Sequence, residues 1–159
     1  MDIPLIEKVK IQAQVLVPLI RTLQAELGEE RATTLIRQAL GAHYRQAGQV
    51  WWRAQGTRSF EEKMDATFDR FAAGDALAYD VLKRTATTFE VNVTRCRYAE
   101  FYKELGVPEL GFLLSCGADL PTVEGFGGEV ELTRTQTIMQ GGDHCDFRYR
   151  LTKEPQEKG

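Results

Sequence analysis

Reactive side chains concentrate in the second half of the chain, where cysteines stand beside carboxylates. Cys116 and Asp119 are three residues apart, so on a helix or in its last turn they share one face. A second group follows the glycine pair at 141–142 and consists of Asp143, His144, Cys145 and Asp146. Thiols, carboxylates and imidazoles are the groups that nucleophilic and acid–base catalysis use. Each also has a structural explanation, because a free cysteine in a strand is usually a small buried residue and an aspartate beside Gly-Gly usually forms a turn.

Arg134 is the charged residue whose position is hardest to explain by solvent exposure. It is in phase with Val130 and Leu132, which predicts that it points to the dry face of a strand. A buried guanidinium needs an anion, because leaving it unpaired is very costly. The partner is Asp119, Asp143 or a substrate carboxylate held by the two-pronged donor fork. A bulge in the strand would instead place Arg134 in solvent.

The first third of the chain is predicted to be helical. Apolar residues recur at spacings of three and four and draw one stripe along a helix: Ile6, Val9, Ala13, Leu16, Ile20, Leu23 and Leu27. Pro18 lies inside this stripe, so we expect a kink or break near Val17. A second helix is expected from Glu29 to about Gly48. The regular stripe also offers a surface through which two copies could form a homo-oligomer.

A third helix begins at a capping box, in which Ser59 is followed three residues later by Glu62. The apolar residues that share one face of this helix are Phe60, Met64, Phe68 and Phe71. This stripe predicts core packing, and it would also suit the lining of a ligand pocket. Trp51 and Trp52 fall in the connection that precedes the helix.

Strands are predicted where apolar and polar residues alternate. The alternation covers residues 89–94, and two helices follow, the second of them starting at Pro108. A loop containing Pro121 then leads to a hairpin with strands at 129–138 and 145–151. The predicted fold class is therefore α+β, with N-terminal helices followed by a small antiparallel sheet that has helices packed on one face.

Length and composition describe one soluble domain. A chain of 159 residues, 43% hydrophobic and 27% charged, fits a single domain at 1–152 with a helical lead-in at 1–75, a mixed part at 76–152 and a frayed tail at 153–159. The net charge of −3 argues against a nucleic-acid partner. No apolar run approaches the roughly 18–20 residues of a membrane helix, and the N-terminus does not have the pattern of a signal peptide. Three cysteines are an odd number, so we expect reduced thiols in a cytoplasmic protein.

Several motifs follow one another in order over residues 89–150. They are a cysteine that enters a helix at Cys96, the GVPEL stretch at 106–110, the C-x-x-D pair at 116–119, Arg134-Thr135, and a glycine turn that leads into Cys145-Asp146-Phe147. This ordered set resembles the L-2-amino-thiazoline-4-carboxylic acid hydrolase family. The resemblance implies an enzyme that opens the ring of a small cyclic amidine or isothiourea and produces an N-carbamoyl amino acid.

Within this resemblance, the favoured mechanism needs no metal or other cofactor. The thiolate of Cys116 or Cys145 attacks the amidine carbon. The other site residues hold the amidinium (Asp119 and Asp146), act as acid and base (His144, with Asp143 leaning over the thiol beside it) or contact the substrate (Cys96 and Arg134). The alternative is a water activated by zinc, with ligands from Cys96, Cys116, His144 or Cys145 and a carboxylate. The spacings match no standard zinc motif, because the chain has no C-x-x-C and no H-x-x-x-H.

A function of another class is a non-catalytic module that binds or senses a small molecule. An α+β domain with an aromatic-lined cavity could bind a small acid and signal through its N-terminal helices without turnover. A thiol that reacts at neutral pH favours catalysis, whereas three inert buried thiols favour the module. We predict that Cys116, Asp119, Cys145 and Asp146 approach one cavity between the sheet and a helix at 108–118. Catalysis by thiol further predicts that Cys145→Ala abolishes hydrolysis.

Overall fold

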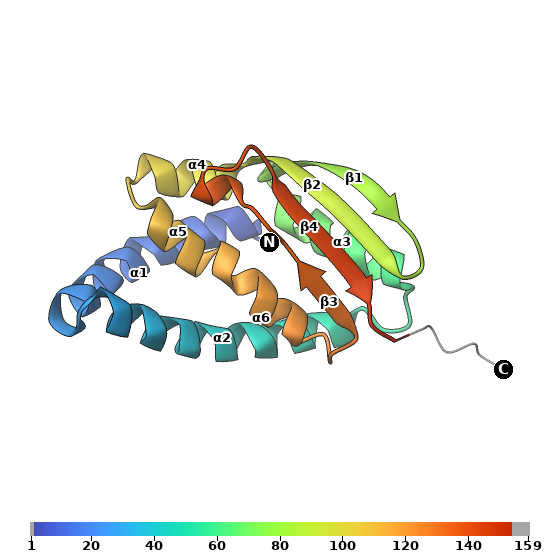
Figure 1. The fold of residues 1–159 in the computed structure, drawn as a ribbon, viewed down its shortest axis with the longest axis horizontal. Coiled ribbons are helices and arrows are strands. Elements are labelled where there is room, and N and C mark those ends of the chain that lie inside the picture. The colour runs from blue at the N-terminus through green and yellow to red at the C-terminus, as the bar shows by residue number, and fades with distance from the viewer. Residues whose placement is uncertain (1, 154–159) are drawn as a thin grey trace.

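Three helices precede a four-stranded sheet in the computed structural model, which describes residues 2–153 (Figure 1). The elements are α1 (Leu5–Leu27), α2 (Glu29–Ala54), α3 (Phe60–Ala72), β1 (Leu77–Arg84), β2 (Thr88–Cys96), α4 (Arg97–Glu104), α5 (Pro108–Leu114), the 3-10 turn η1 (Cys116–Ala118), α6 (Asp119–Glu124), β3 (Val130–Thr133), the 3-10 turn η2 (Ile138–Gln140) and β4 (Cys145–Leu151). The tail predicted at 153–159 lies outside the described residues except for Lys153. The predicted α+β class is confirmed.

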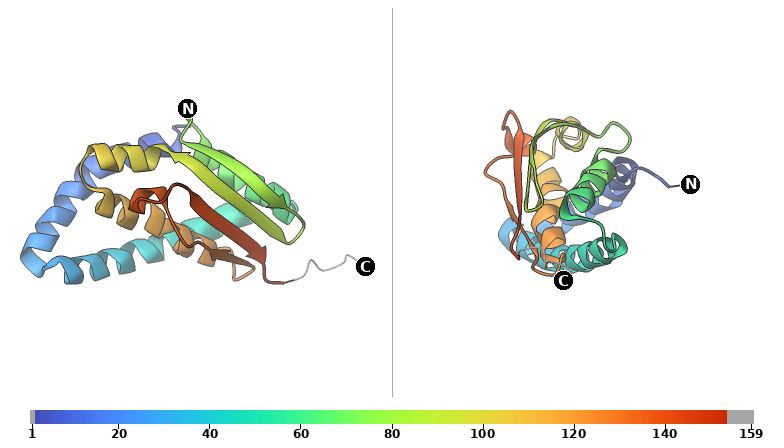
Figure 2. Two further views of the ribbon diagram at one scale, coloured as in Figure 1. Left: turned by 45° about the horizontal axis from the view of Figure 1, so that its top comes forward. Right: turned by 90° about the vertical axis from the view of Figure 1, so that its right-hand side faces the viewer.

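The sheet is antiparallel throughout and has the strand order β1-β2-β4-β3. Its inner face is buried and faces the helices, which cover that side of the sheet (Figure 2). The alternation predicted for β2 and β4 is confirmed, since the buried residues of the two strands are Phe89, Val91, Val93, Cys145, Phe147 and Tyr149. Val93 is paired with Cys145 in the register between these strands. Cys145, the first residue of β4, therefore lies on the inner face of the sheet, which faces the helices.

Helix α1 continues through Pro18, so the break expected near Val17 does not occur. Pro18 cannot donate to the carbonyl of Gln14, but both residues are exposed and water can satisfy that carbonyl. The predicted stripe is used inside the chain, where Ile6, Ala13 and Ile20 are buried. A different row on the same helix is exposed and consists of Ile11, Val15 and Leu19. The homo-oligomer stays a prediction. The exposed row is the apolar surface of α1 through which two copies could associate.

Helix α2 runs to Ala54 and does not end near Gly48, so Trp51 and Trp52 belong to the helix and not to a connection. The glycine is needed for packing and not for a helix end. A Cβ atom at Gly48 would lie 2.0 Å from the carbonyl oxygen of Thr122, which shows how closely α6 crosses α2 at this point. Sequence periodicity alone cannot distinguish these two uses of a glycine.

The start of α3 is confirmed as a capping box. The amide of Glu62 donates to Ser59 Oγ at 3.2 Å, and the amide of Ser59 donates to Glu62 Oε2 at 2.8 Å. The aromatic stripe of this helix contributes Phe60, Met64 and Phe68 to the buried core. Phe68 also lines the main cavity, so the two interpretations of the stripe both apply.

Three further features differ from what the sequence predicted. Strand β1 was missed because it is a mostly exposed edge strand with two register shifts, and its sequence does not alternate. Pro121 belongs to α6 and not to a loop, since proline is compatible with the first turn of a helix. Strand β3 ends at Thr133 instead of 138, because the side chain of Asp146 takes the next backbone donors, the amides of Thr135 and Gln136, both at 2.9 Å.

Candidate functional site

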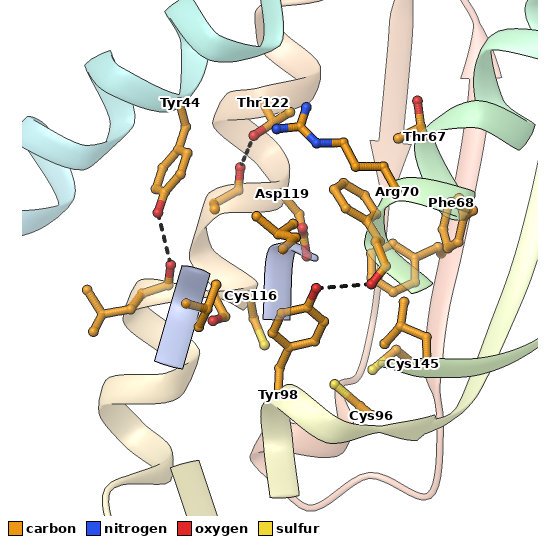
Figure 3. A pocket seen from close by; sticks show the side chains of 18 of the residues that line it. Tyr44, Thr67, Phe68, Arg70, Cys96, Tyr98, Cys116, Asp119, Thr122 and Cys145 are labelled. Atoms are coloured by element: carbon orange, nitrogen blue, oxygen red, sulfur yellow. Dashed lines mark hydrogen bonds between the residues drawn. The ribbon is translucent and has the colours of Figure 1, made fainter. Parts of the chain in front are cut away.

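The helices and the inner face of the sheet enclose a cavity of about 340 Å³. Side chains from α1, α2, α3, β2, β4 and the segment from α5 to α6 line it, and Figure 3 shows many of them. Most of the lining is apolar or aromatic, including Phe68, Phe71, Val93 and Phe147. Small-molecule sites in proteins have this character and carry only a few polar groups. The cavity is therefore the candidate site.

All three cysteines line this cavity, although they come from segments far apart in the sequence. Cys96 ends β2 and caps α4, where its sulfur accepts a hydrogen bond from the amide of Ala99 at 3.4 Å. Cys116 stands in η1, and Cys145 begins β4, where its sulfur accepts from the amide of Ile138 at 3.2 Å. None of the three is in a disulfide.

Burial keeps these thiols protonated. It raises the pKa of Cys96 to about 11, and it raises the pKa values of Cys116 and Cys145 as well. The Asp119 carboxylate raises the pKa of Cys116 further, whereas Arg134 acts in the opposite direction. In the free protein at neutral pH, the thiolate form that nucleophilic attack requires is therefore a small fraction.

Asp119 and Arg134 form an ion pair in the wall of the cavity. Arg134 Nη1 donates to Asp119 Oδ2 at 2.5 Å, and Arg134 Nη2 donates to the carbonyl oxygen of Cys116 at 3.3 Å. The guanidinium also lies 5.4 Å from the centre of the Phe147 ring. The sequence predicted an inward Arg134 with an anionic partner, and the structure shows that this partner is Asp119 and not Asp143.

The Asp119 carboxyl is unusually easy to protonate for an aspartate beside an arginine. Burial raises its pKa to about 6, and the charge and hydrogen bond of Arg134 limit that rise. Its side chain is 20% exposed and lines the cavity. No described residue donates a hydrogen bond to Oδ1, so this oxygen is free to accept one from a ligand. Asp119 is thus a carboxylate that faces an apolar space and titrates near physiological pH.

The other predicted site residues do not line the cavity: Asp143, His144 and Asp146. His144 Nδ1 lies 2.5 Å from Asp143 Oδ1 and 3.0 Å from Gln136 Nε2, so these three side chains form a cluster at the turn before β4. Asp146 is in the strand position after Cys145 and so points to the opposite face of the sheet. Of the four residues predicted to approach one cavity, Cys116, Asp119 and Cys145 line it. Asp146 does not, and instead accepts hydrogen bonds from the backbone that follows β3.

Family assignment follows from comparison with known proteins. The model of the family described as L-2-amino-thiazoline-4-carboxylic acid hydrolase matches residues 8–149. The chain belongs to this family. The match extends over α1 to β4 and so includes the helices as well as the motif-bearing second half.

The fold is also similar to that of a solved structure. The chain is similar to the crystal structure of the phenol-responsive sensory domain of the transcription activator PoxR with phenol, with a TM-score of 0.54 and 11% identity, covering 89% of this chain and 75% of that one. At this identity the likeness concerns the fold alone. No curated protein matches the chain significantly.

Several polar residues that line the cavity were not predicted from the sequence. Tyr98 donates from its hydroxyl to the carbonyl of Phe71 at 3.0 Å, and Tyr44 donates to the carbonyl of Leu114 at 3.4 Å. The helical phase could have identified both, because both lie on the inward sides of their helices. Arg70 also lines the cavity, and no sequence signal distinguishes it from other charged residues of α3.

The zinc alternative would require at least three ligand side chains to meet at one point. Among residues 2–153, no three side chains of histidine, cysteine, aspartate or glutamate lie close enough together to hold a metal ion. Cys96, Cys116 and Cys145 share the cavity wall without forming such a group. Within the same described part of the chain, no helix is both long and apolar enough to cross a bilayer.

We expect the three native thiols to react slowly at pH 7. Their raised pKa values leave little thiolate, and burial limits access of a reagent. The measurement is titration with Ellman's reagent of the native protein and of the protein unfolded in guanidinium chloride. All three thiols should react promptly only after unfolding. A thiol that reacts within seconds in the native protein would contradict this and would become the candidate nucleophile.

Proposed function

We propose that the chain is a hydrolase that opens the ring of a small cyclic amidine or isothiourea, bound in the cavity against Asp119. The observation that carries this proposal is the position of Asp119, a carboxylate in an apolar cavity with one oxygen to which no described residue donates. An amidinium group presents N–H donors and a positive charge to such a carboxylate. Membership of the hydrolase family supports the same substrate class.

The chemistry is the addition of water across one ring bond. The water oxygen bonds to the amidine carbon, and the bond from that carbon to the ring heteroatom breaks. The substrate binds as its amidinium, so one water proton goes to the departing heteroatom and the other is released to solvent, which gives an N-carbamoyl product. Asp119 holds the amidinium, and its negative charge stabilises this protonated form, whose carbon is more electrophilic than that of the neutral amidine. The hydroxyl group of Tyr98 and the thiol group of Cys116 also belong to residues that line this cavity.

Attack by water requires less of this site than attack by a cysteine. Each thiol must first lose a proton that burial holds firmly, whereas a water molecule needs only a nearby base when its attack begins. The thiol route predicted from the sequence stays a proposal for Cys116 and Cys145. Cys116→Ala and Cys145→Ala decide it, since the variant that lacks the nucleophile loses turnover entirely.

A binding or sensory module is the second candidate. The apolar lining and the protonated thiols support it, and the structurally similar PoxR domain is described as phenol-responsive. In that case the cavity would hold a small apolar molecule with one polar group directed at Asp119. A cytoplasmic location, expected from the unpaired cysteines, is proposed for either function.

The test is an assay of a panel of cyclic amidines and isothioureas, with and without a chelator, in parallel with calorimetric binding measurements. Chelator-resistant release of an N-carbamoyl product supports the hydrolase without a metal. Binding without turnover of any compound would overturn the hydrolase and favour the module. Loss of turnover on chelation would overturn the metal-free reaction.

A further inference from the structure

The cavity contains one cationic side chain that no ion pair between described residues accounts for. Apart from the pair of Asp119 and Arg134, which is neutral as a unit, the charged side chains of the lining are Lys8 and Arg70. The ammonium group of Lys8 lies 3.3 Å from Asp2 Oδ1. Arg70 takes part in none of the ion pairs between described residues. The lining thus has a guanidinium that no carboxylate among residues 2–153 holds.

Arg70 is held in place by an aromatic ring and not by an acid. Its guanidinium carbon lies 4.7 Å from the centre of the Trp51 ring. Trp51 is itself fixed, because its Nε1 donates to Thr67 Oγ1 at 3.0 Å. A guanidinium on an aromatic face keeps its N–H edge free, and that edge matches the two oxygens of a carboxylate. Stacking therefore orients Arg70 without using its donors.

The cavity lining carries two side chains with opposite charge preferences. In the view of Figure 3, the Arg70 side chain extends from α3 in the direction of Thr122 of α6, whereas Asp119 lies closer to Cys116 and Tyr98. Asp119 offers a carboxylate oxygen for a cationic group, and Arg70 offers donors for an anionic one. Arg134, the residue predicted to hold a substrate carboxylate, already donates to Asp119.

We propose that Arg70, stacked on Trp51, binds a carboxylate at the outer end of a substrate whose amidinium end meets Asp119. This assignment rests on the proposed function and makes it more specific, because it identifies a residue of this chain that would hold an acidic group of the substrate. Arg70 is then a residue that determines specificity and takes no part in the bond-breaking step. Its loss should weaken binding of the acid and leave the chemical step largely intact.

The test compares a carboxylate-bearing cyclic amidine with its carboxamide, which has similar size and no charge at that end. Binding is measured by calorimetry and turnover by product release, for the wild type, Arg70→Gln and Arg70→Lys. The wild type should bind the acid more tightly than the amide. Arg70→Gln should weaken binding of the acid about tenfold, because that is the usual contribution of a hydrogen bond to a charged group that is exposed to solvent. It should leave binding of the amide unchanged. Arg70→Lys should recover part of the loss, since it keeps the charge without the fork.

Arg53→Gln is the matched control, because Arg53 is an exposed arginine of α2 that does not line the cavity. It should leave the preference for the acid intact. An Arg70→Gln variant that keeps the wild-type preference, or a wild type without any preference, overturns the role of Arg70 while hydrolysis still stands. Binding with an Arg70-dependent preference but no turnover overturns the hydrolase and leaves the carboxylate site in place. Failure of both compounds to bind overturns both proposals.

Discussion

Replacing Asp119 by asparagine should lower kcat/KM for a cyclic amidine by about a hundredfold or more. The amide cannot supply the negative charge that holds the amidinium, and removing one group that stabilises charge in this way typically costs a factor of about 100 to 1,000. Steady-state kinetics with the compound that gives turnover measures the loss. Asp80→Asn is the control, because Asp80 is an exposed carboxylate on the edge strand β1. An Asp119→Asn variant with wild-type kcat/KM would remove Asp119 from the reaction.

The pH dependence of activity provides a second readout of the same carboxyl. Only the ionised form holds an amidinium, and the pKa of Asp119 is about 6, so kcat/KM should rise as pH increases through about 6 and level off above it. Removing the positive charge in Arg134→Gln should raise the pKa of Asp119 further and move this midpoint to higher pH. An unchanged midpoint would show that the titrating group is not Asp119.

The free energy of unfolding should also depend on the ionisation of Asp119. Its contribution should decrease with rising pH, whereas kcat/KM should increase. The folded protein keeps the Asp119 proton up to a pKa of about 6, whereas an unperturbed aspartate loses it near 3.8. Between these values the folded state binds more protons than the unfolded state, so this residue makes the free energy of unfolding decrease as pH rises. Other carboxyls with lowered pKa values, such as Asp146 and Glu100, act in the other direction. The difference in pH slope between wild type and Asp119→Asn isolates the contribution of Asp119.

Gly48→Ala should destabilise the protein by about 3 kcal/mol. The new methyl group would lie 2.0 Å from the carbonyl oxygen of Thr122 and 3.0 Å from its Cα atom, both of them backbone atoms. Helices α2 and α6 would have to separate. Because α6 begins with Asp119, the carboxylate should move as well. Urea unfolding measures the stability, and the activity assay reports on the displacement.

Gly41→Ala is the matched control in the same helix. A Cβ atom there would meet only the end of the Arg45 side chain, at 3.6 Å, which is ordinary contact. Alanine is about 1 kcal/mol more favourable than glycine inside a helix, so this variant should be as stable as the wild type or slightly more stable. Equal stability of the Gly48→Ala and Gly41→Ala variants would contradict the close crossing of α2 and α6.

Features that depend on local pattern could be predicted from the sequence. Alternation identified the buried faces of β2 and β4, and the spacing of Ser59 and Glu62 identified the start of α3. The phase of Arg134 indicated an inward guanidinium and hence an anionic partner. Each of these rests on the period of a helix or strand, or on a contact between residues close in the chain. The ordered motifs also identified the family.

Which residues meet was decided only by the tertiary structure. The sequence left the partner of Arg134 open between Asp119, Asp143 and a substrate carboxylate, and packing of α6 against the end of β3 places Asp119 against it. The His144 cluster had the composition of a catalytic group, yet the turn before β4 places it outside the cavity. Arg70 joins the site only because α2 and α3 bring Trp51 beneath it. Local pattern determines which way a side chain points, whereas its neighbours depend on how elements distant in the sequence pack together.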